Sequence, residues 1–95
     1  MNLKNKKVII TGATGGIGNS LVKKFVEGGS IVLATGTKEE KLNNLKSKFS
    51  DLQIEKFNLA EHSKIETFIE SANNKLGGLD ILINNAGINL DSLTI

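Results

Sequence analysis

Four short apolar runs alternate with three longer segments of helical periodicity, and this alternation restricts the chain to one class of fold. The runs have the length and aliphatic character of strands buried on both faces. They are Val8–Ile10, Ile31–Ala34, Ile54–Leu59 and Ile81–Ile83, and the third is less apolar than the others and expected nearer an edge. Because strands that alternate with helices pair in parallel, the order β-α-β-α-β-α-β predicts a doubly wound α/β fold.

The three intervening segments repeat apolar residues at the spacing of a helical turn. The predicted buried faces are Ile17, Leu21, Val22, Phe25 and Val26; Leu42, Leu45 and Phe49; and Ile65, Phe68, Ile69, Ala72 and Leu76. The first helix is expected to begin near Gly16, and the second falls within residues 37–49. Gly28-Gly29 and Gly77-Gly78 are typical helix ends. The tail, Ile88–Ile95, could begin another helix.

The stretch TGATGGIG, Thr11–Gly18, joins the first strand to the first helix and contains four glycines. This junction lies at the carboxyl end of a parallel strand, where open α/β sheets bind ligands. The helix there presents unpaired N–H groups and the positive end of its dipole, which favour an anion, typically a pyrophosphate. Glycines let the backbone approach such a ligand, and Gly18 would let the helix pack closely on the sheet. The alternative is a tight turn without a ligand.

A second polar motif, NNAG at Asn84–Gly87, ends the fourth strand at the same edge of the sheet. In the strand order 3-2-1-4, the first and fourth strands are neighbours with the ligand crevice between them. Asparagine side chains offer both donors and acceptors there. The alternative is a strand-ending turn, which Asn and Gly favour for conformational reasons.

Together, TGATGGIG and NNAG resemble the N-terminal half of the short-chain dehydrogenase/reductase family. The resemblance covers all 95 residues. Within the family, the segment NNAGINLDSL is most similar to the 3-oxoacyl-[acyl-carrier-protein] reductases, with Asn89 and Leu90 as departures from their pattern. The resemblance implies that residues 1–95 form the N-terminal part of a Rossmann-type NAD(P)-binding domain.

The same resemblance implies a set of cofactor-binding residues. The loop that would wrap the cofactor diphosphate and adjoining ribose consists of Gly12, Ala13, Thr14, Gly15, Gly16, Ile17 and Gly18. Asn58 and Leu59, ending the third strand, would face the adenine. The ribose nearer the nicotinamide would be lined by Asn85, Ala86 and Gly87. Asn84 is expected instead to tie neighbouring strands together.

The end of the second strand bears on the choice between NADP and NAD. It reads Thr35-Gly36-Thr37-Lys38 and contains no acid, whereas NAD enzymes usually place Asp or Glu there. A hydroxyl and an ammonium tolerate a 2′-phosphate, so NADP(H) is favoured over NAD(H), with Thr37 and Lys38 as contacts. Two alternatives stay open: Thr37 and Glu40 form a helix capping box, and Lys38 is a solvated lysine.

The resemblance further implies an NADPH-dependent reductase of fatty acid biosynthesis, cytoplasmic and homo-oligomeric at full length, that acts on acyl-carrier-protein substrates. The family's proton donor is a tyrosine assisted by a lysine and a serine, and this chain contains no tyrosine. No catalytic residue is therefore assigned within residues 1–95. The alternative is a non-catalytic nucleotide-binding fragment, or a subunit whose sheet a partner chain completes, because the fourth strand would otherwise be an open edge.

Charge and composition exclude several other classes. All twelve basic residues are lysines that alternate with acidic residues, and the net charge of +2 does not indicate a nucleic-acid surface. No apolar run has the length of a signal peptide or a membrane span. The chain has no cysteine, so no disulfide or thiolate metal site is expected.

Overall fold

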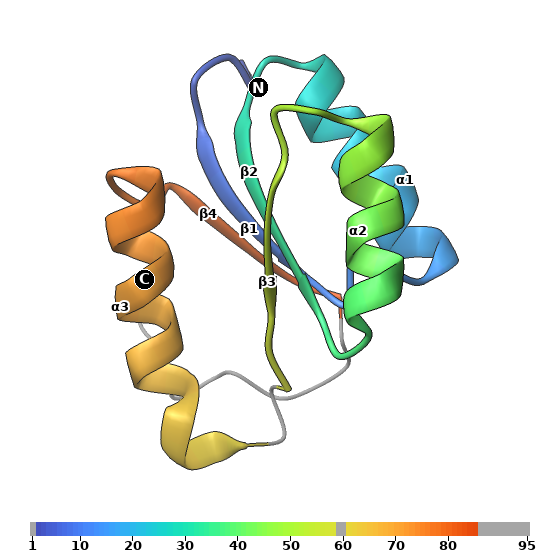
Figure 1. Ribbon diagram of the computed structural model, residues 1–95. Helices are drawn as coiled ribbons and strands as arrows, with labels where there is room; N and C mark the ends of the chain where they lie inside the picture. Colours follow the sequence, from blue (N-terminus) through green and yellow to red (C-terminus); the bar gives the residue numbers. More distant parts are fainter. Residues whose placement is uncertain (1, 59–60, 86–95) are drawn as a thin grey trace.

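The computed structural model describes residues 2–58 and 61–85, and within them the predicted alternation of strands and helices is confirmed. The elements in chain order are β1 (Lys7–Thr11), α1 (Gly16–Glu27), β2 (Ile31–Gly36), α2 (Glu39–Lys48), β3 (Gln53–Lys56), the short 3-10 helix η1 (His62–Lys64), α3 (Ile65–Leu76) and β4 (Ile81–Asn84). Figure 1 shows the sheet between α1 and α2 on one side and α3 on the other.

The four strands form one parallel sheet in the order β3-β2-β1-β4, which confirms the predicted topology. β1 lies at the centre: Ile9 pairs with Leu33 of β2 on one side and with Leu82 of β4 on the other. Because the sheet is parallel, the carboxyl ends of all four strands meet at one edge. The turns that follow β1 and β2, and the polar end of β4, therefore lie close together.

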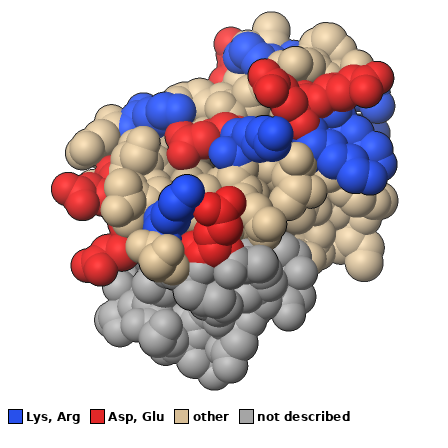
Figure 2. All heavy atoms as spheres, turned by 60° about the horizontal axis from the view of Figure 1, so that its bottom comes forward, with Lys and Arg blue, Asp and Glu red and all other residues tan. Residues whose placement is uncertain are grey.

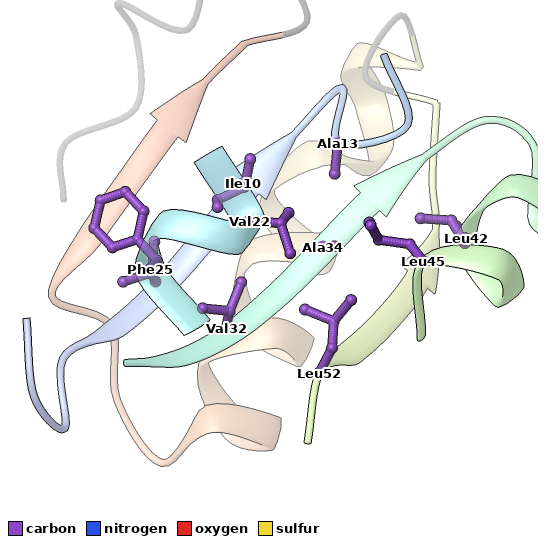
Figure 3. Packing of buried hydrophobic residues seen from close by; sticks show 10 residues of the cluster. Ile10, Ala13, Val22, Phe25, Val32, Ala34, Leu42, Leu45 and Leu52 are labelled. Carbon is purple, nitrogen blue, oxygen red and sulfur yellow. The ribbon is translucent and has the colours of Figure 1, made fainter. Parts of the chain in front are cut away.

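The two faces of the sheet carry separate apolar clusters, as expected for strands buried on both sides. On the α1 and α2 face the cluster includes Val8, Ile10, Ala13, Val22, Phe25, Val32, Ala34, Leu42, Leu45 and Leu52 (Figure 3). On the α3 face Ile9, Leu33, Phe68, Ala72 and Leu76 pack together. Successive residues of β1 thus alternate between the two clusters, because the side chains of a strand alternate in direction.

The predicted third strand, Ile54–Leu59, is wrong in its limits, because β3 runs from Gln53 to Lys56. The N–H of Phe57 still donates to the carbonyl oxygen of Gly36 at 2.9 Å, which extends the ladder by one residue. The Phe57 ring then stacks on Phe68 of α3, with ring centroids 4.4 Å apart. This aromatic pair explains why an apolar run continues beyond the strand.

One local prediction for the helices is also wrong, and one alternative left open for Thr37 is not seen. Ile17 was expected on the buried face of α1 but is 71% exposed, because the buried stripe runs through Gly18, Val22 and Phe25 instead. The capping box of Thr37 and Glu40 does not form: α2 begins at Glu39, and its N-cap residue is Lys38, with no side-chain cap hydrogen bond.

The glycine pairs end α1 and α3 as predicted. Gly28 caps α1 and Gly29 follows with φ of 89°, while Gly77 and Gly78 follow α3 with φ of 74° and 139°. These left-handed angles strain any residue with a Cβ. The possible helix at Ile88–Ile95 lies outside the described residues.

β4 is the edge of the sheet within the described part of the chain, as predicted, and Ile81, Leu82 and Ile83 are only half-buried. On the face drawn in Figure 2, lysines are interspersed with Asp and Glu rather than gathered in one basic area. Among the helices of residues 2–58 and 61–85, none has the length and apolar character needed to cross a membrane.

Candidate functional site

The glycine-rich loop lies at the carboxyl end of the central strand. It leaves β1 through Gly12, whose φ of 61° places it in the left-handed region that favours glycine. The N–H of Ala13 donates to the carbonyl oxygen of Thr35 at 3.1 Å, which ties the loop to β2. The Ala13 methyl is fully buried in the cluster beneath α1 and α2 (Figure 3). The loop is therefore anchored by both a hydrogen bond and core packing.

Two glycines at the start of α1 have opposite surroundings. A Cβ at Gly18 would lie 2.3 Å from the carbonyl oxygen of Gly12 and 2.7 Å from Cα of Ala13. Gly18 thus lets the helix pack on the loop backbone, rather than on the sheet as expected from the sequence. A Cβ at Gly16 would have no neighbour within 4 Å. Gly16 faces open space at the site where the sequence predicts a ligand.

The loop and the first turn of α1 present backbone donors. Within the described residues, no protein acceptor is recorded for the N–H groups of Thr14, Gly16, Ile17 and Gly18, while the N–H of Asn19 donates to Gly15 at 2.8 Å. This arrangement is the usual one for the first turn of a helix. Together with the positive end of the helix dipole, these donors suit an anion with several oxygens, such as a diphosphate.

β4 brings Asn85 to the loop from the other side. The Asn85 side chain donates through Nδ2 to the carbonyl oxygen of Gly12 at 3.1 Å, and its backbone N–H donates to Thr11 Oγ1 at 3.0 Å. Thr11 Oγ1 lies 3.2 Å from both the Ile83 carbonyl oxygen and Asn84 Oδ1, so its single proton can serve either. The interpretation of Asn84 as a tie between neighbouring strands is confirmed.

The end of β2 lies against the loop through Thr14 and Gly36. A Cβ at Gly36 would lie 3.1 Å from Thr14 Cγ2, so the absence of a side chain at Gly36 makes room for Thr14. The next two residues, Thr37 and Lys38, are exposed and form the turn into α2. Their polar groups lie in sequence directly beyond this contact, at the same edge of the sheet.

Asn58 is exposed two residues beyond the end of β3, and its carbonyl oxygen accepts from the N–H of Glu61 at 3.0 Å. The structure therefore brings Gly12–Gly18, Thr37, Lys38, Asn58 and Asn85 to the carboxyl edge of the sheet. The remaining predicted site residues, Leu59, Ala86 and Gly87, lie outside the described residues.

Three residues that support the site were not singled out from the sequence: Thr11, Asn19 and Gly36. Asn19 donates from Nδ2 to the carbonyl oxygens of Ala13, at 3.2 Å, and Gly15, at 2.8 Å. Asparagine is a poor residue for a helix interior and favours local bonds to the backbone. For Asn19, the available signal was an asparagine in the first helical turn after a glycine loop. The role of Gly36 had no such signal, because it depends on a contact with Thr14, which is distant in sequence.

The short chain dehydrogenase family matches residues 6–94. The chain is similar to a 3alpha-hydroxysteroid dehydrogenase of Mediterraneibacter gnavus, at 40% identity over 93% of this chain and 38% of that protein. It is also similar to an NADP-dependent 3-hydroxy acid dehydrogenase of Escherichia coli, at 37% identity over 87% of this chain and 34% of that protein.

Among solved structures, the fold is similar to that of a 3-ketoacyl-(acyl-carrier-protein) reductase from Brucella melitensis complexed with NADH. The TM-score is 0.77 and the identity 25%, over 84% of this chain and 33% of that one. The chain thus spans only 34–38% of the length of the two enzymes named above and 33% of this structure. With the family match extending over nearly all of its residues and the parallel order β3-β2-β1-β4 in the sheet, the chain belongs to the short-chain dehydrogenase family.

Proposed function

We propose that this chain is the cofactor-binding part of an NADPH-dependent oxidoreductase that reduces 3-oxoacyl-[acyl-carrier-protein]. The observation that carries the cofactor proposal is the set of backbone N–H donors at Thr14 and Gly16–Gly18. Among these residues, Gly16 borders open space, because a Cβ there would have no neighbour within 4 Å. These groups fit a diphosphate, which accepts several hydrogen bonds and carries negative charge. Family membership supports the same assignment.

A nicotinamide dinucleotide, when bound, would supply or accept the hydride. The residues of this chain would bind and orient the dinucleotide. Gly12–Gly18 would bind the diphosphate and adjoining ribose. Asn85 is bonded to Gly12 and Thr11 beside the loop, where it would border the ribose nearer the nicotinamide, with Ala86 and Gly87. Asn58 and Leu59 would face the adenine. The chain contains no tyrosine, so the family's proton donor is not among these residues.

The preference for NADP(H) rests on the turn after β2. Thr37 and Lys38 offer a hydroxyl and an ammonium, and no carboxylate is present between Thr35 and Lys38 to repel a 2′-phosphate. Several relatives, including the Escherichia coli enzyme, are named NADP-dependent, whereas the Brucella structure holds NADH. The proposed preference therefore rests on the residues of this chain, not on the relatives.

The proposed substrate rests on the segment NNAGINLDSL and on the reductase among the structural neighbours. The complete gene product is assayed for NADPH oxidation with an acetoacetyl thioester, a free 3-oxo acid and a 3-oxo steroid. We expect the highest kcat/KM with the thioester. A higher value with the steroid or the free acid would replace the proposed substrate but keep the proposed reaction, and the absence of NADPH and NADH binding would overturn both.

The second candidate is a non-catalytic nucleotide-binding subunit. The half-buried Ile81, Leu82 and Ile83 at the β4 edge favour it, because an apolar edge strand tends to pair with another segment. Under this alternative the purified protein binds NADPH but oxidises it with none of the three substrates. It then elutes as a complex with a second polypeptide in size-exclusion chromatography.

A further inference from the structure

Asn19 holds the glycine-rich loop from the first turn of α1. Its side-chain nitrogen Nδ2 lies 2.8 Å from the carbonyl oxygen of Gly15 and 3.2 Å from that of Ala13. Both neighbours are acceptors, so the amide must present its NH2 group to them, and its two N–H bonds match the two oxygens. The side chain is half-buried, which limits competition from water.

These two carbonyl groups set the direction of two donors in the loop. No described peptide bond is cis, and in a trans peptide the C=O and the following N–H lie in one plane and point in opposite directions. The Ala13 carbonyl therefore fixes the N–H of Thr14, and the Gly15 carbonyl fixes the N–H of Gly16. These N–H groups are two of the donors without a recorded protein acceptor in the described part of the chain.

The peptide between Gly12 and Ala13 is held by other groups. The Gly12 carbonyl accepts from Asn85 Nδ2 at 3.1 Å, and the Ala13 N–H donates to Thr35. Gly18 lets the first turn of α1 lie directly on Gly12 and Ala13. Asn19 is thus the side chain that contacts the carbonyl groups of two peptides whose N–H groups have no protein acceptor in the described part of the chain. Its own backbone N–H adds a second bond to the Gly15 carbonyl oxygen, at 2.8 Å.

We propose that Asn19 is a positioning residue for the cofactor diphosphate: by fixing the peptides Ala13–Thr14 and Gly15–Gly16, it aims the Thr14 and Gly16 N–H groups at the ligand. This inference rests on the proposed dinucleotide site and deepens it. Asn19 itself touches no reacting atom. Its contribution is to remove the freedom of these two peptides before the ligand arrives, so that binding does not have to order them.

The test compares two ligands in three variants of the complete gene product. ADP carries the diphosphate, whereas adenosine has the same base and ribose without phosphate, and both are titrated by NMR. Asn19→Leu preserves the size of the side chain and removes its donors. Asn74→Leu is the matched control, because Asn74 is an exposed asparagine on α3, on the opposite side of the sheet.

A third variant restores part of the clamp. Ser20 Oγ donates to the carbonyl oxygen four residues earlier, Gly16, at 3.2 Å. A serine at position 19 should reach the Gly15 carbonyl in the same way but not the Ala13 carbonyl. Asn19→Ser therefore keeps one of the two bonds, and it serves as the deciding variant if Asn19→Leu does not fold.

We expect Asn19→Leu to weaken ADP binding by about tenfold and Asn19→Ser by about threefold, with adenosine binding unchanged in both. Asn74→Leu should bind both ligands like the wild type. Equal loss for ADP and adenosine, or wild-type ADP affinity in a folded Asn19 variant, would overturn the role of Asn19. If the wild type binds neither ADP, NADP⁺ nor NAD⁺, the proposed function itself fails, so the two failures are distinct.

Discussion

The turns β1–α1 and β2–α2 both lead from a strand to a helix at the same edge of the sheet, but they are held very differently. The first is bonded to β2 through Ala13, to β4 through Asn85 and to its own helix through Asn19. The second, at Thr37 and Lys38, is exposed and has no side-chain cap hydrogen bond. A rigid turn suits the diphosphate that all NAD(P) cofactors share, and an open turn suits the group in which they differ.

Gly18→Ala should have the largest effect, because it breaks the rigid turn itself. The added Cβ would lie 2.3 Å from the Gly12 carbonyl oxygen, so the backbone of the loop or helix has to move. We expect a loss of about 3 kcal/mol in the free energy of unfolding, measured in urea, together with loss of nucleotide binding. Gly15→Ala is the control, since its Cβ would be 3.9 Å from the same oxygen. Equal stability of the two variants would refute the close approach.

Gly16→Val tests nucleotide binding by the β1–α1 turn without a large change in protein stability. A Cβ at this position would have no neighbour within 4 Å outside its own helix backbone and the adjoining residues, so we expect the melting temperature to stay close to that of the wild type. The same side chain would occupy the space proposed for the diphosphate, and NADPH affinity should fall by about a hundredfold or more in a calorimetric titration. Asn43→Val, on the exposed side of α2, is the control. Unchanged affinity in Gly16→Val would show that the ligand does not bind along this loop.

Lys38→Ala tests the open turn. If the ammonium contacts the 2′-phosphate, NADPH affinity should fall by about fivefold while NADH affinity stays the same. Lys41→Ala is the control, because Lys41 is an exposed lysine three residues further along, in α2. It should leave both affinities unchanged. A parallel loss for NADPH and NADH would indicate a general effect of charge and would remove the contrast between the two turns.

Thr35→Val should have the smallest effect, because it changes a buried side chain of β2 and leaves the residues of both turns unchanged. Thr35 is 1% exposed, and its Oγ1 has no hydrogen-bond partner in the described part of the chain. Replacing an unsatisfied buried hydroxyl with a methyl group should raise the free energy of unfolding by about 1 kcal/mol. NADPH affinity should not change, because the loop is bonded to the backbone oxygen of Thr35. A destabilised Thr35→Val would mean that the hydroxyl has a partner.

Much of the fold could be predicted because its signals are local. The runs around Ile9, Leu33 and Leu82 are apolar throughout because both faces of a parallel strand are covered, and the helices repeat apolar residues at one-turn spacing. The pattern gave wrong predictions where an apolar residue fits a helix or strand by its spacing but has a different environment in the structure. Ile17 fits the helical spacing but lies at the exposed start of α1, and Phe57 continues an apolar run in order to stack on Phe68 rather than to extend β3.

The candidate site also has a part that could be predicted from the sequence and a part that could not. The loop Gly12–Gly18 is recognisable because glycine is required locally, by the left-handed φ of Gly12 and by the backbone contact at Gly18. The residues that fix its shape were less apparent. Thr11 acts through β4, and Gly36 through the side chain of Thr14. Neither partner is near in sequence, so neither role follows from spacing.

The amino-acid sequence alone determined the order of strands and helices, the position of the glycine turn and the family, because each depends on residue types at short separations. Only the tertiary structure decided which peptides of the turn are held and by which side chains. Besides the local Asn19, the turn is held by the side chain of Asn85 and by the backbone oxygen of Thr35, which the chain crossovers bring to the loop from opposite sides. Hydrogen bonds act over about 3 Å, and contacts of this range are set by the packed sheet rather than by spacing along the chain.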